Sequence, residues 1–161
     1  MADRISRGEI LIRTAELWAL RSTCFKPNGA VLARDGRIIA IGYNGSPAGH
    51  PHCLDVGCEE GPDGGCQRTL HAEANAIAMA ARFGVSTEGS IMYCTSSPCP
   101  MCAKLLINAG IKEFYFRTLY RITDGIGLML RSHIQVYQFR GQITVPIMGK
   151  ELEGGGFEVE L

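Results

Sequence analysis

Apolar positions in the first quarter of the chain change from helical to strand spacing. Ser6 and Glu9 form a capping-box pair at the start of the segment 7–22. This segment carries apolar side chains at helical intervals. The apolar runs 29–33 and 37–43 flank an Asp-Gly pair, which is a strong signal for a β-hairpin. The pattern therefore predicts a first helix followed by two antiparallel strands.

Beyond residue 70, helical and strand patterns alternate. The helical segments end at a glycine or begin with prolines, as helices often do, and the strand segments are short and apolar. The predicted helices cover 72–84, 98–110 and about 124–133, and the predicted strands cover 90–95, 113–117 and 134–139. The tail after residue 142 is expected to add a strand or to fray.

Two antiparallel strands followed by alternating helices and strands predict a mixed sheet with helices on both faces. We therefore expect an α/β protein, a three-layer α/β/α sandwich with a mixed central sheet of about five strands. The 161 residues fit a single domain, 1–161. The segment 46–69 is dense in Gly, Pro, Cys and His, and it reads as an insert that needs something to organise it.

Composition and charge narrow the class of protein. No apolar run approaches the roughly 18 residues of a membrane helix, so no membrane partner is expected. The first ten residues are too polar for a secretory signal, and a cytoplasmic protein is expected. Basic and acidic residues balance at 16 each. A polymeric nucleic acid is therefore not an expected partner, whereas a small phosphorylated ligand needs only a cation or two.

Three potential metal ligands stand at predicted helix starts. Cys99 and Cys102 form a Cys-x-x-Cys pair whose spacing lets both sulfurs face one point, and a helix N-terminus favours thiolates. His71 stands at the start of the preceding helix. Two thiolates and one imidazole suit Zn²⁺ and leave a fourth position open to water, which is typical of a catalytic site.

Glu73 lies two residues beyond His71, so the carboxylate is displaced around the helix from the metal ligand. Zinc activates water near neutral pH, and a neighbouring carboxylate can pass protons to a ring nitrogen and a leaving amine. His-x-Glu together with Pro-Cys-x-x-Cys is the signature of zinc nucleobase deaminases, and Pro98 completes it here. Taken separately, the two cysteines also fit a redox pair, and the histidine fits a helix cap.

With these motifs, the sequence resembles the deoxycytidylate (dCMP) deaminase family of the cytidine deaminase superfamily. The resemblance runs from about residue 22 to residue 120. Besides the Cys-rich insert, it rests on 42-GYNGSPAG-49, 71-HAEANAI-77, 97-SPCPMCAK-104 and 108-NAGIKE-113. It implies a cytidine deaminase-like fold and hydrolysis of dCMP to dUMP and ammonia. It also implies a homo-oligomer, often a hexamer, that is activated by dCTP and inhibited by dTTP, with Mg²⁺ bound to these effectors.

The resemblance assigns roles to individual residues. Glu73 would be the proton shuttle beside three catalytic zinc ligands, His71, Cys99 and Cys102. Asn44 would hydrogen-bond the sugar, although an asparagine before a glycine also fits a turn. Tyr120 would contact the nucleotide, although a tyrosine after a strand is more often packed. Effectors would bind at Gly42, Tyr43, Asn44 and Gly45. Independently, the backbone N–H of Ala72 at the helix start could contact the base.

The insert offers a second metal site. A closed zinc would organise a segment that lacks the apolar content to fold by itself, and some members of the family carry a structural zinc there. The expected ligands are Cys24, Cys53, Cys58 and Cys66, with His50 or His52 as a substitute. Reduced cysteines without a metal are the alternative.

The contact to a phosphate group stays open at this point. A monophosphate needs arginine or lysine, and the sequence does not rank the candidates Lys26, Arg34, Arg68, Arg117 and Arg121. Two other functions also stay open, a deaminase of RNA or free nucleosides and an inactive deaminase fold that binds nucleotides. The neutral charge and the Gly-Tyr-Asn-Gly stretch disfavour the first, and the complete His/Cys/Glu set disfavours the second.

Overall fold

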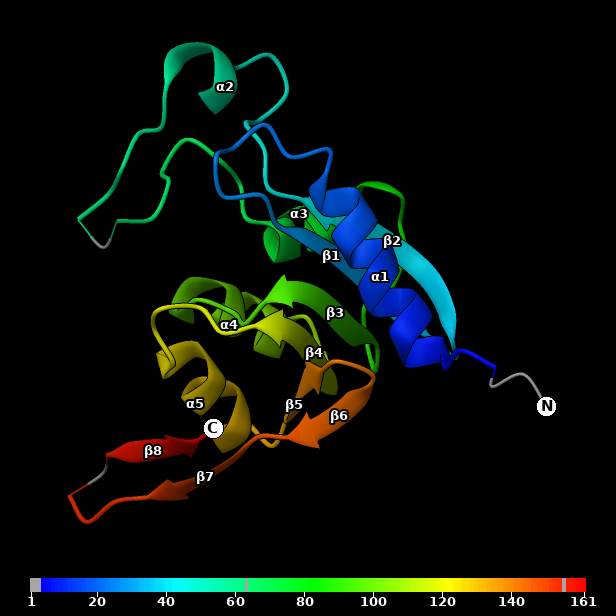
Figure 1. Ribbon diagram of the computed structural model, residues 1–161, viewed down its shortest axis with the longest axis vertical. Coiled ribbons are helices and arrows are strands. Elements are labelled where there is room, and N and C mark those ends of the chain that lie inside the picture. Colours follow the sequence, from blue (N-terminus) through cyan, green and yellow to red (C-terminus); the bar gives the residue numbers. More distant parts are fainter. Residues whose placement is uncertain (1–3, 63, 155) are drawn as a thin grey trace.

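The computed structural model describes residues 4–62, 64–154 and 156–161, and a six-stranded sheet forms their centre (Figure 1). Across the sheet the strands are β2 (Arg37–Tyr43), β1 (Gly29–Arg34), β3 (Ile91–Ser96), β4 (Glu113–Thr118), β5 (Gln135–Arg140) and β6 (Ile143–Pro146). The strands β3, β4 and β5 run parallel, and the remaining pairs are antiparallel. The predicted mixed sheet is confirmed, with one strand more than about five.

Helices cover both faces of this sheet. On one face α1 (Arg7–Ala19) packs against β1, β2 and β3. On the other face lie α3 (Ala72–Arg82), α4 (Pro100–Asn108) and α5 (Asp124–Arg131), with α3 against β2 and β1 and with α4 against α5. The three-layer α/β/α arrangement is therefore confirmed. No helix in the described ranges is long and apolar enough to span a bilayer.

Each central strand supplies side chains to two apolar cores. In β1, Val31 packs with α1, whereas Leu32 packs with α3 and α4 on the opposite face. In β4, Phe114 and Phe116 are fully buried on the α3 face, and Tyr115 packs on the α1 face. Alternation with a period of two thus buries both faces, which explains why these strands read as continuous apolar runs.

The local signals in the sequence match the observed turns. Asp35 and Gly36 both adopt positive φ, 52° and 72°, as the two-residue turn between β1 and β2 requires. Ser6 caps α1 by accepting a hydrogen bond from the backbone N–H of Glu9 at 3.1 Å. Gly84, with φ of 66°, follows the end of α3.

The insert and the tail contain elements that the sequence pattern did not specify. A short helix, α2 (Cys53–Val56), lies within the insert. After β6, the strands β7 (Met148–Glu151) and β8 (Phe157–Glu160) form a separate hairpin that packs on α5. The Arg131 guanidinium lies 5.2 Å from the centre of the Phe157 ring and joins the hairpin to that helix. The tail therefore forms strands in its described part.

The start of α3 lies close to β2 because position 42 is a glycine. A Cβ added at Gly42 would overlap the backbone of Ala72 and Ala76. Ala72, Ala76 and Ala80 are all buried along the side of α3 that faces the sheet. Small residues on both elements let the two backbones approach, and this contact fixes where α3 begins.

Replacing Gly42 with alanine is expected to lower the free energy of unfolding by about 1–3 kcal/mol, the usual cost of overpacking. The added methyl group would meet backbone atoms, which cannot move aside unless α3 shifts. Urea unfolding of the variant and the parent measures this difference. Arg37→Ala, at an exposed position on the same strand, is the control and should change stability by less than about 0.5 kcal/mol. Equal stability of Gly42→Ala and the parent would contradict the close packing of α3.

Candidate active site and metal centres

A cavity opens where the starts of α3 and α4 meet the ends of β2, β3 and β4. The predicted site residues His71, Ala72, Glu73, Cys99, Asn44 and Tyr120 all line it. Cys102, the remaining predicted ligand, is buried beside the cavity on the first turn of α4. The structure therefore brings the predicted catalytic residues to one place.

Both metal-binding motifs lie at helix N-caps. His71 is the N-cap residue of α3, and Cys99 is the N-cap residue of α4, where its sulfur accepts the backbone N–H of Cys102 at 3.4 Å. The Nδ1 atom of His71 lies 3.4 Å from the Cys99 sulfur and 3.5 Å from the Cys102 sulfur. Packing of the two helices on one sheet thus brings three potential donor atoms together, one nitrogen and two sulfurs.

These separations fit a zinc ion. With bonds of about 2.3 Å to sulfur and 2.0–2.1 Å to nitrogen, a tetrahedral zinc holds its sulfur and nitrogen ligands about 3.6 Å apart. A hydrogen bond from Cys102 lowers the pKa of Cys99 to about 4, and the same bond raises the pKa of Cys102. One sulfur is therefore already disposed to be a thiolate, the form that binds a metal.

Glu73 occupies the first turn of α3 and is almost fully buried on the cavity wall. Its carboxylate does not belong to the group of donor atoms formed by His71, Cys99 and Cys102. Burial raises the pKa of Glu73 to about 6. A hydrogen bond with Cys102 keeps the carboxylate beside the three donor atoms, and its role as a proton shuttle stays a prediction.

Asn44 holds the segment that leads into β1. Its Oδ1 atom accepts the backbone N–H of Asn28 at 2.7 Å, and its Nδ2 atom donates to the carbonyl of Lys26 at 2.9 Å. Each side-chain group of an asparagine can make a second hydrogen bond, so these contacts are compatible with a ligand in the cavity. The predicted contact with a sugar stays a prediction.

The rest of the Gly-Tyr-Asn-Gly stretch supports α3 and the segment before it. Tyr43 stacks on Trp18, with ring centres 6.3 Å apart, and its carbonyl accepts a hydrogen bond from the Asn75 side chain at 2.9 Å. Gly45 and Leu70 exchange backbone hydrogen bonds of 3.2 and 3.0 Å immediately before His71. Effector binding at this stretch is not tested by these contacts and stays a prediction.

The four predicted insert ligands also converge. The sulfurs of Cys24, Cys53, Cys58 and Cys66 all lie within 4.8 Å of one another. The sulfurs of Cys53 and Cys66 lie 3.5 Å apart, near the roughly 3.8 Å between sulfurs on a tetrahedral zinc. The Nδ1 atom of His52 instead lies 3.1 Å from the Thr23 hydroxyl. The donor set fits a closed Cys₄ zinc site without a histidine.

The thiols of this cluster differ in pKa. Burial raises the pKa of Cys53 to about 12, and a hydrogen bond to Cys66 raises the pKa of Cys58 to about 11. Burial alone would raise the pKa of Cys66, but hydrogen bonds from Cys58 and Thr69 lower it to about 6. Four sulfurs held this closely favour a shared cation over four separate thiolates.

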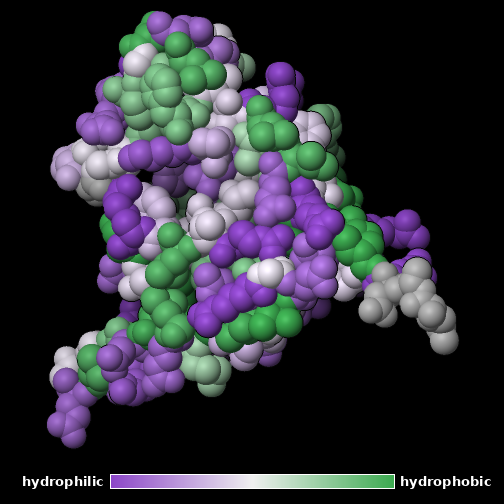
Figure 2. Space-filling model, viewed as in Figure 1, coloured by the Kyte–Doolittle hydropathy of each residue, from purple (hydrophilic) through white to green (hydrophobic). Residues whose placement is uncertain are grey.

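The insert that carries these cysteines exposes its apolar residues. Leu54 and Val56 of α2 are more than half exposed. Figure 2 shows the corresponding hydrophobic patch at the top of the molecule, with a hollow below it. The insert therefore lacks a core of its own, and the cysteine cluster is its main point of organisation.

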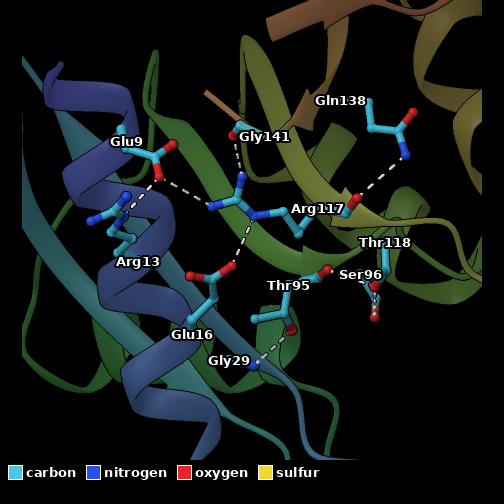
Figure 3. Close-up of polar contacts among 10 residues, drawn as sticks. All are labelled: Glu9, Arg13, Glu16, Gly29, Thr95, Ser96, Arg117, Thr118, Gln138 and Gly141. Carbon is cyan, nitrogen blue, oxygen red and sulfur yellow. Dashed lines mark hydrogen bonds and ion pairs between the residues drawn. The ribbon is translucent and has the colours of Figure 1, made fainter. Parts of the chain in front are cut away.

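Arg117, one candidate for a phosphate contact, is committed elsewhere. Its Nε atom donates to Glu16 at 2.8 Å, and its two terminal nitrogens lie 3.4 Å from Glu9 and 2.8 Å from the Gly141 carbonyl (Figure 3). These contacts lie on the α1 side of the sheet, where they join α1 to β4 and to the turn after β5. The arginine therefore stabilises the packing of α1.

Of the other four candidates for a phosphate contact, two have partners away from the cavity and two line the cavity. Arg34 donates to a main-chain carbonyl of the turn before β3 at 2.9 Å, and Arg68 pairs with Glu59 at 3.5 Å. Lys26 and Arg121 both line the cavity. The Arg121 guanidinium also lies over the Tyr120 ring, 4.7 Å from its centre. The structure thus reduces the candidates for a phosphate contact to Lys26 and Arg121.

Several polar cavity residues were missed from the sequence. Asn28 accepts hydrogen bonds from the hydroxyls of Thr95 and Ser96 at 2.8 and 2.6 Å, and Ser97 accepts the backbone N–H of Tyr120 at 2.8 Å. Asn28, Ser96 and Ser97 all line the cavity. Three consecutive hydroxyl residues between an apolar strand and the Pro-Cys motif were the signal that could have indicated them.

The family model described as "Cytidine and deoxycytidylate deaminase zinc-binding region" matches residues 6–118, which include both cysteine clusters and Glu73. The chain therefore belongs to the cytidine and deoxycytidylate deaminase family. The description of this family's region as zinc-binding agrees with the fit of the His71, Cys99 and Cys102 donor atoms to a zinc ion.

Individual members of the family are similar over most of the chain. ComE operon protein 2 of Bacillus subtilis is 48% identical over 120 residues, which cover 74% of this chain and 63% of that protein. Deoxycytidylate deaminase of Enterobacteria phage T4 is 36% identical, covering 71% and 79%. Deoxycytidylate deaminase of Saccharomyces cerevisiae is 34% identical, covering 84% and 46%. The chain thus spans less than two thirds of the Bacillus and yeast proteins.

A solved structure in the same family has a similar fold. The dCMP deaminase of cyanophage S-TIM5, in complex with dCMP and dUMP, aligns with a TM-score of 0.73 and 40% identity. The alignment covers 81% of this chain and 95% of the phage protein. The cytidine deaminase-like fold expected from the sequence is confirmed.

Proposed function

We propose that this protein hydrolyses dCMP to dUMP and ammonia, with a zinc ion held by His71, Cys99 and Cys102. The observation that carries the proposal is the convergence in one cavity of these ligands, a buried carboxylate and two cations. Its substrate is supported by relatives that are named deoxycytidylate deaminases and by the phage enzyme in complex with dCMP and dUMP.

The chemistry is divided between the metal and the protein. When bound, zinc supplies Lewis acidity that makes a water molecule nucleophilic near neutral pH. Glu73 accepts a proton from the attacking water and passes it to N3 of the cytosine ring. It then takes the remaining proton of the hydroxyl group added at C4 and passes it to the amine, which leaves C4 as ammonia. In this proposal the backbone N–H of Ala72 orients the base, and the Asn44 side chain orients the sugar. Lys26 and Arg121 supply the positive charge that a 5′-phosphate requires.

Glu73→Gln is expected to lower kcat by about 10²–10⁴-fold, since the amide keeps the shape of the carboxyl group but cannot transfer the proton. Steady-state kinetics on dCMP, with circular dichroism and zinc content measured in parallel, check the prediction. Fold and zinc content should match the parent. Glu153→Gln, at an exposed tail position, is the matched control and should keep full activity. Undiminished turnover by Glu73→Gln would rule out this proton shuttle.

We also propose a structural zinc at Cys24, Cys53, Cys58 and Cys66, so that each chain holds one catalytic and one structural ion. Metal analysis of the purified protein should find about two zinc ions per chain. His71→Ala should lose the catalytic ion and keep the other. A parent protein with one zinc per chain, all of it lost in His71→Ala, would exclude the insert site.

Substrate choice separates this proposal from other deaminases of the family. Purified protein is offered dCMP, deoxycytidine and a tRNA anticodon hairpin, and ammonia release is followed. Only dCMP should be turned over efficiently, because the cations of the cavity recognise its phosphate. Equal turnover of deoxycytidine would show that the phosphate is not recognised, and turnover of the hairpin would indicate an RNA substrate.

Regulation by effectors is proposed from the resemblance to the dCMP deaminase family. We infer that the enzyme is a homo-oligomer, a hexamer, that dCTP with Mg²⁺ activates and dTTP inhibits. The dependence of rate on dCMP should then be sigmoidal, become hyperbolic with dCTP and be suppressed by dTTP, with coupling of about 1–3 kcal/mol. Kinetics that ignore both nucleotides would indicate an unregulated enzyme.

A further inference from the structure

We propose that the Cys24/Cys53/Cys58/Cys66 cluster positions the two cations of the cavity, so that metal occupancy of this cluster controls recognition of the substrate 5′-phosphate. The inference rests on the proposed deamination of dCMP. It assigns the insert a role in substrate binding in addition to its own folding.

The cluster and the cavity share a wall. Cys24 and Cys66 line the cavity, and so does Gly65 beside them. Cys53 and Cys58 do not line it, and they close the cluster from the side of the insert. A shift in the cluster would therefore move part of the substrate pocket directly.

Lys26 lies between the two cysteines that line the cavity. It follows Cys24 by two residues, and its Nζ atom donates to the carbonyl of Gly64 at 3.3 Å, two residues before Cys66. Its own carbonyl accepts the hydrogen bond from Asn44. The ammonium group is thus held by a segment of the insert whose position depends on Cys66.

Arg121 also lies close to this segment. Its guanidinium carbon lies 4.0 Å from the position that a Cβ on Gly64 would occupy. Gly64 adopts a φ of 71°, a conformation that favours glycine, and it leaves space for the guanidinium. Two cations from distant parts of the chain therefore meet at Gly64, beside the cluster.

Short-range contacts, which include an antiparallel bridge between Glu60 and Cys66, hold the segment that carries Gly64. Its backbone hydrogen bonds are local, from Gly61 to Gly65 and from Gly64 to Gly61, both at 2.8 Å, and from Gln67 to Glu59 at 2.7 Å. Of its described residues, 61, 62 and 64–67, none supplies a large apolar side chain to the core. A cation bound by the four sulfurs would join this segment to Cys24 and would fix Gly64, the partner of Lys26. Removal of the cation would leave the position of Gly64 less restricted.

Cys58→Ser is the variant that tests this coupling, because Cys58 belongs to the cluster but does not line the cavity. Zinc content, kcat and KM for dCMP, and the Kd of dUMP by calorimetry are measured. We expect loss of about one zinc per chain and a rise of about tenfold or more in KM and Kd, with kcat changed less than twofold. Tenfold corresponds to about 1.4 kcal/mol, within the range of one charge-assisted hydrogen bond.

Lys26→Met, alone and combined with Cys58→Ser, identifies the route of the coupling. If the cluster acts through Lys26, the double variant should bind dUMP about as weakly as the single variants, since both remove the same interaction. Lys26→Met should keep all of its zinc. Lys112→Met, at an exposed lysine outside the cavity, is the control and should match the parent.

Two results would overturn the inference. One is an unchanged KM and Kd after loss of the second zinc. The other is a combined fall in kcat and in catalytic zinc, with effects that multiply in the double variant, which is the behaviour of a general structural staple. If Cys58→Ser does not fold, graded zinc removal by a chelator from the parent and from Lys26→Met gives the same comparison. A parent that binds dUMP but does not deaminate dCMP would refute the proposed function and not this coupling.

Discussion

The close approach of α3 to β2 is the contact on which the site depends. Gly42 leaves room for the backbone of Ala72 and Ala76, and this fixes the start of the helix that carries His71 and Glu73. A second close approach, in which an added Cβ on Gly125 would overlap the carbonyl of Pro98, seats α5 beneath the start of α4. Two of the proposed metal ligands, His71 and Cys99, are N-cap residues, and Cys102 lies in the first turn of α4. Their positions therefore follow from backbone packing more than from side-chain choice.

Placing a carboxylate and two thiols at helix N-termini sets opposing electrostatic effects against each other. A helix N-terminus favours the anionic forms, and burial disfavours them. For Glu73 burial prevails, because its pKa rises to about 6. For Cys99 the hydrogen bond from Cys102 prevails over burial, and its pKa falls to about 4. The same fold thus provides a group that can carry a proton and a sulfur that gives one up readily.

Turns and helix starts could be predicted from the sequence, whereas contacts between residues that are distant in the sequence could not. The Asp35-Gly36 turn and the helix starts at His71 and Cys99 are set by neighbouring residues, so the local sequence predicted these elements and the places of the expected ligands at helix starts. Asn28 carries no motif, and its place in the cavity depends on hydrogen bonds with Thr95 and Ser96 at the end of β3, more than 60 residues away in the sequence. The β7–β8 hairpin was equally hidden, because it depends on the packing of Phe157 against α5.

The distribution of cations explains how a chain with no net charge can bind an anion. Arg117 is neutralised by Glu9 and Glu16 on the far side of the sheet, so it cannot contribute to the cavity. The positive charge at the cavity therefore comes from Lys26 and Arg121, which meet at the insert. An insert without a core would be a poor support for charges that must be placed accurately, since ordering it costs conformational entropy. A cation held by the four cysteines would offset that cost where the two basic side chains converge, and this gives a physical reason for placing the cluster against the proposed substrate pocket.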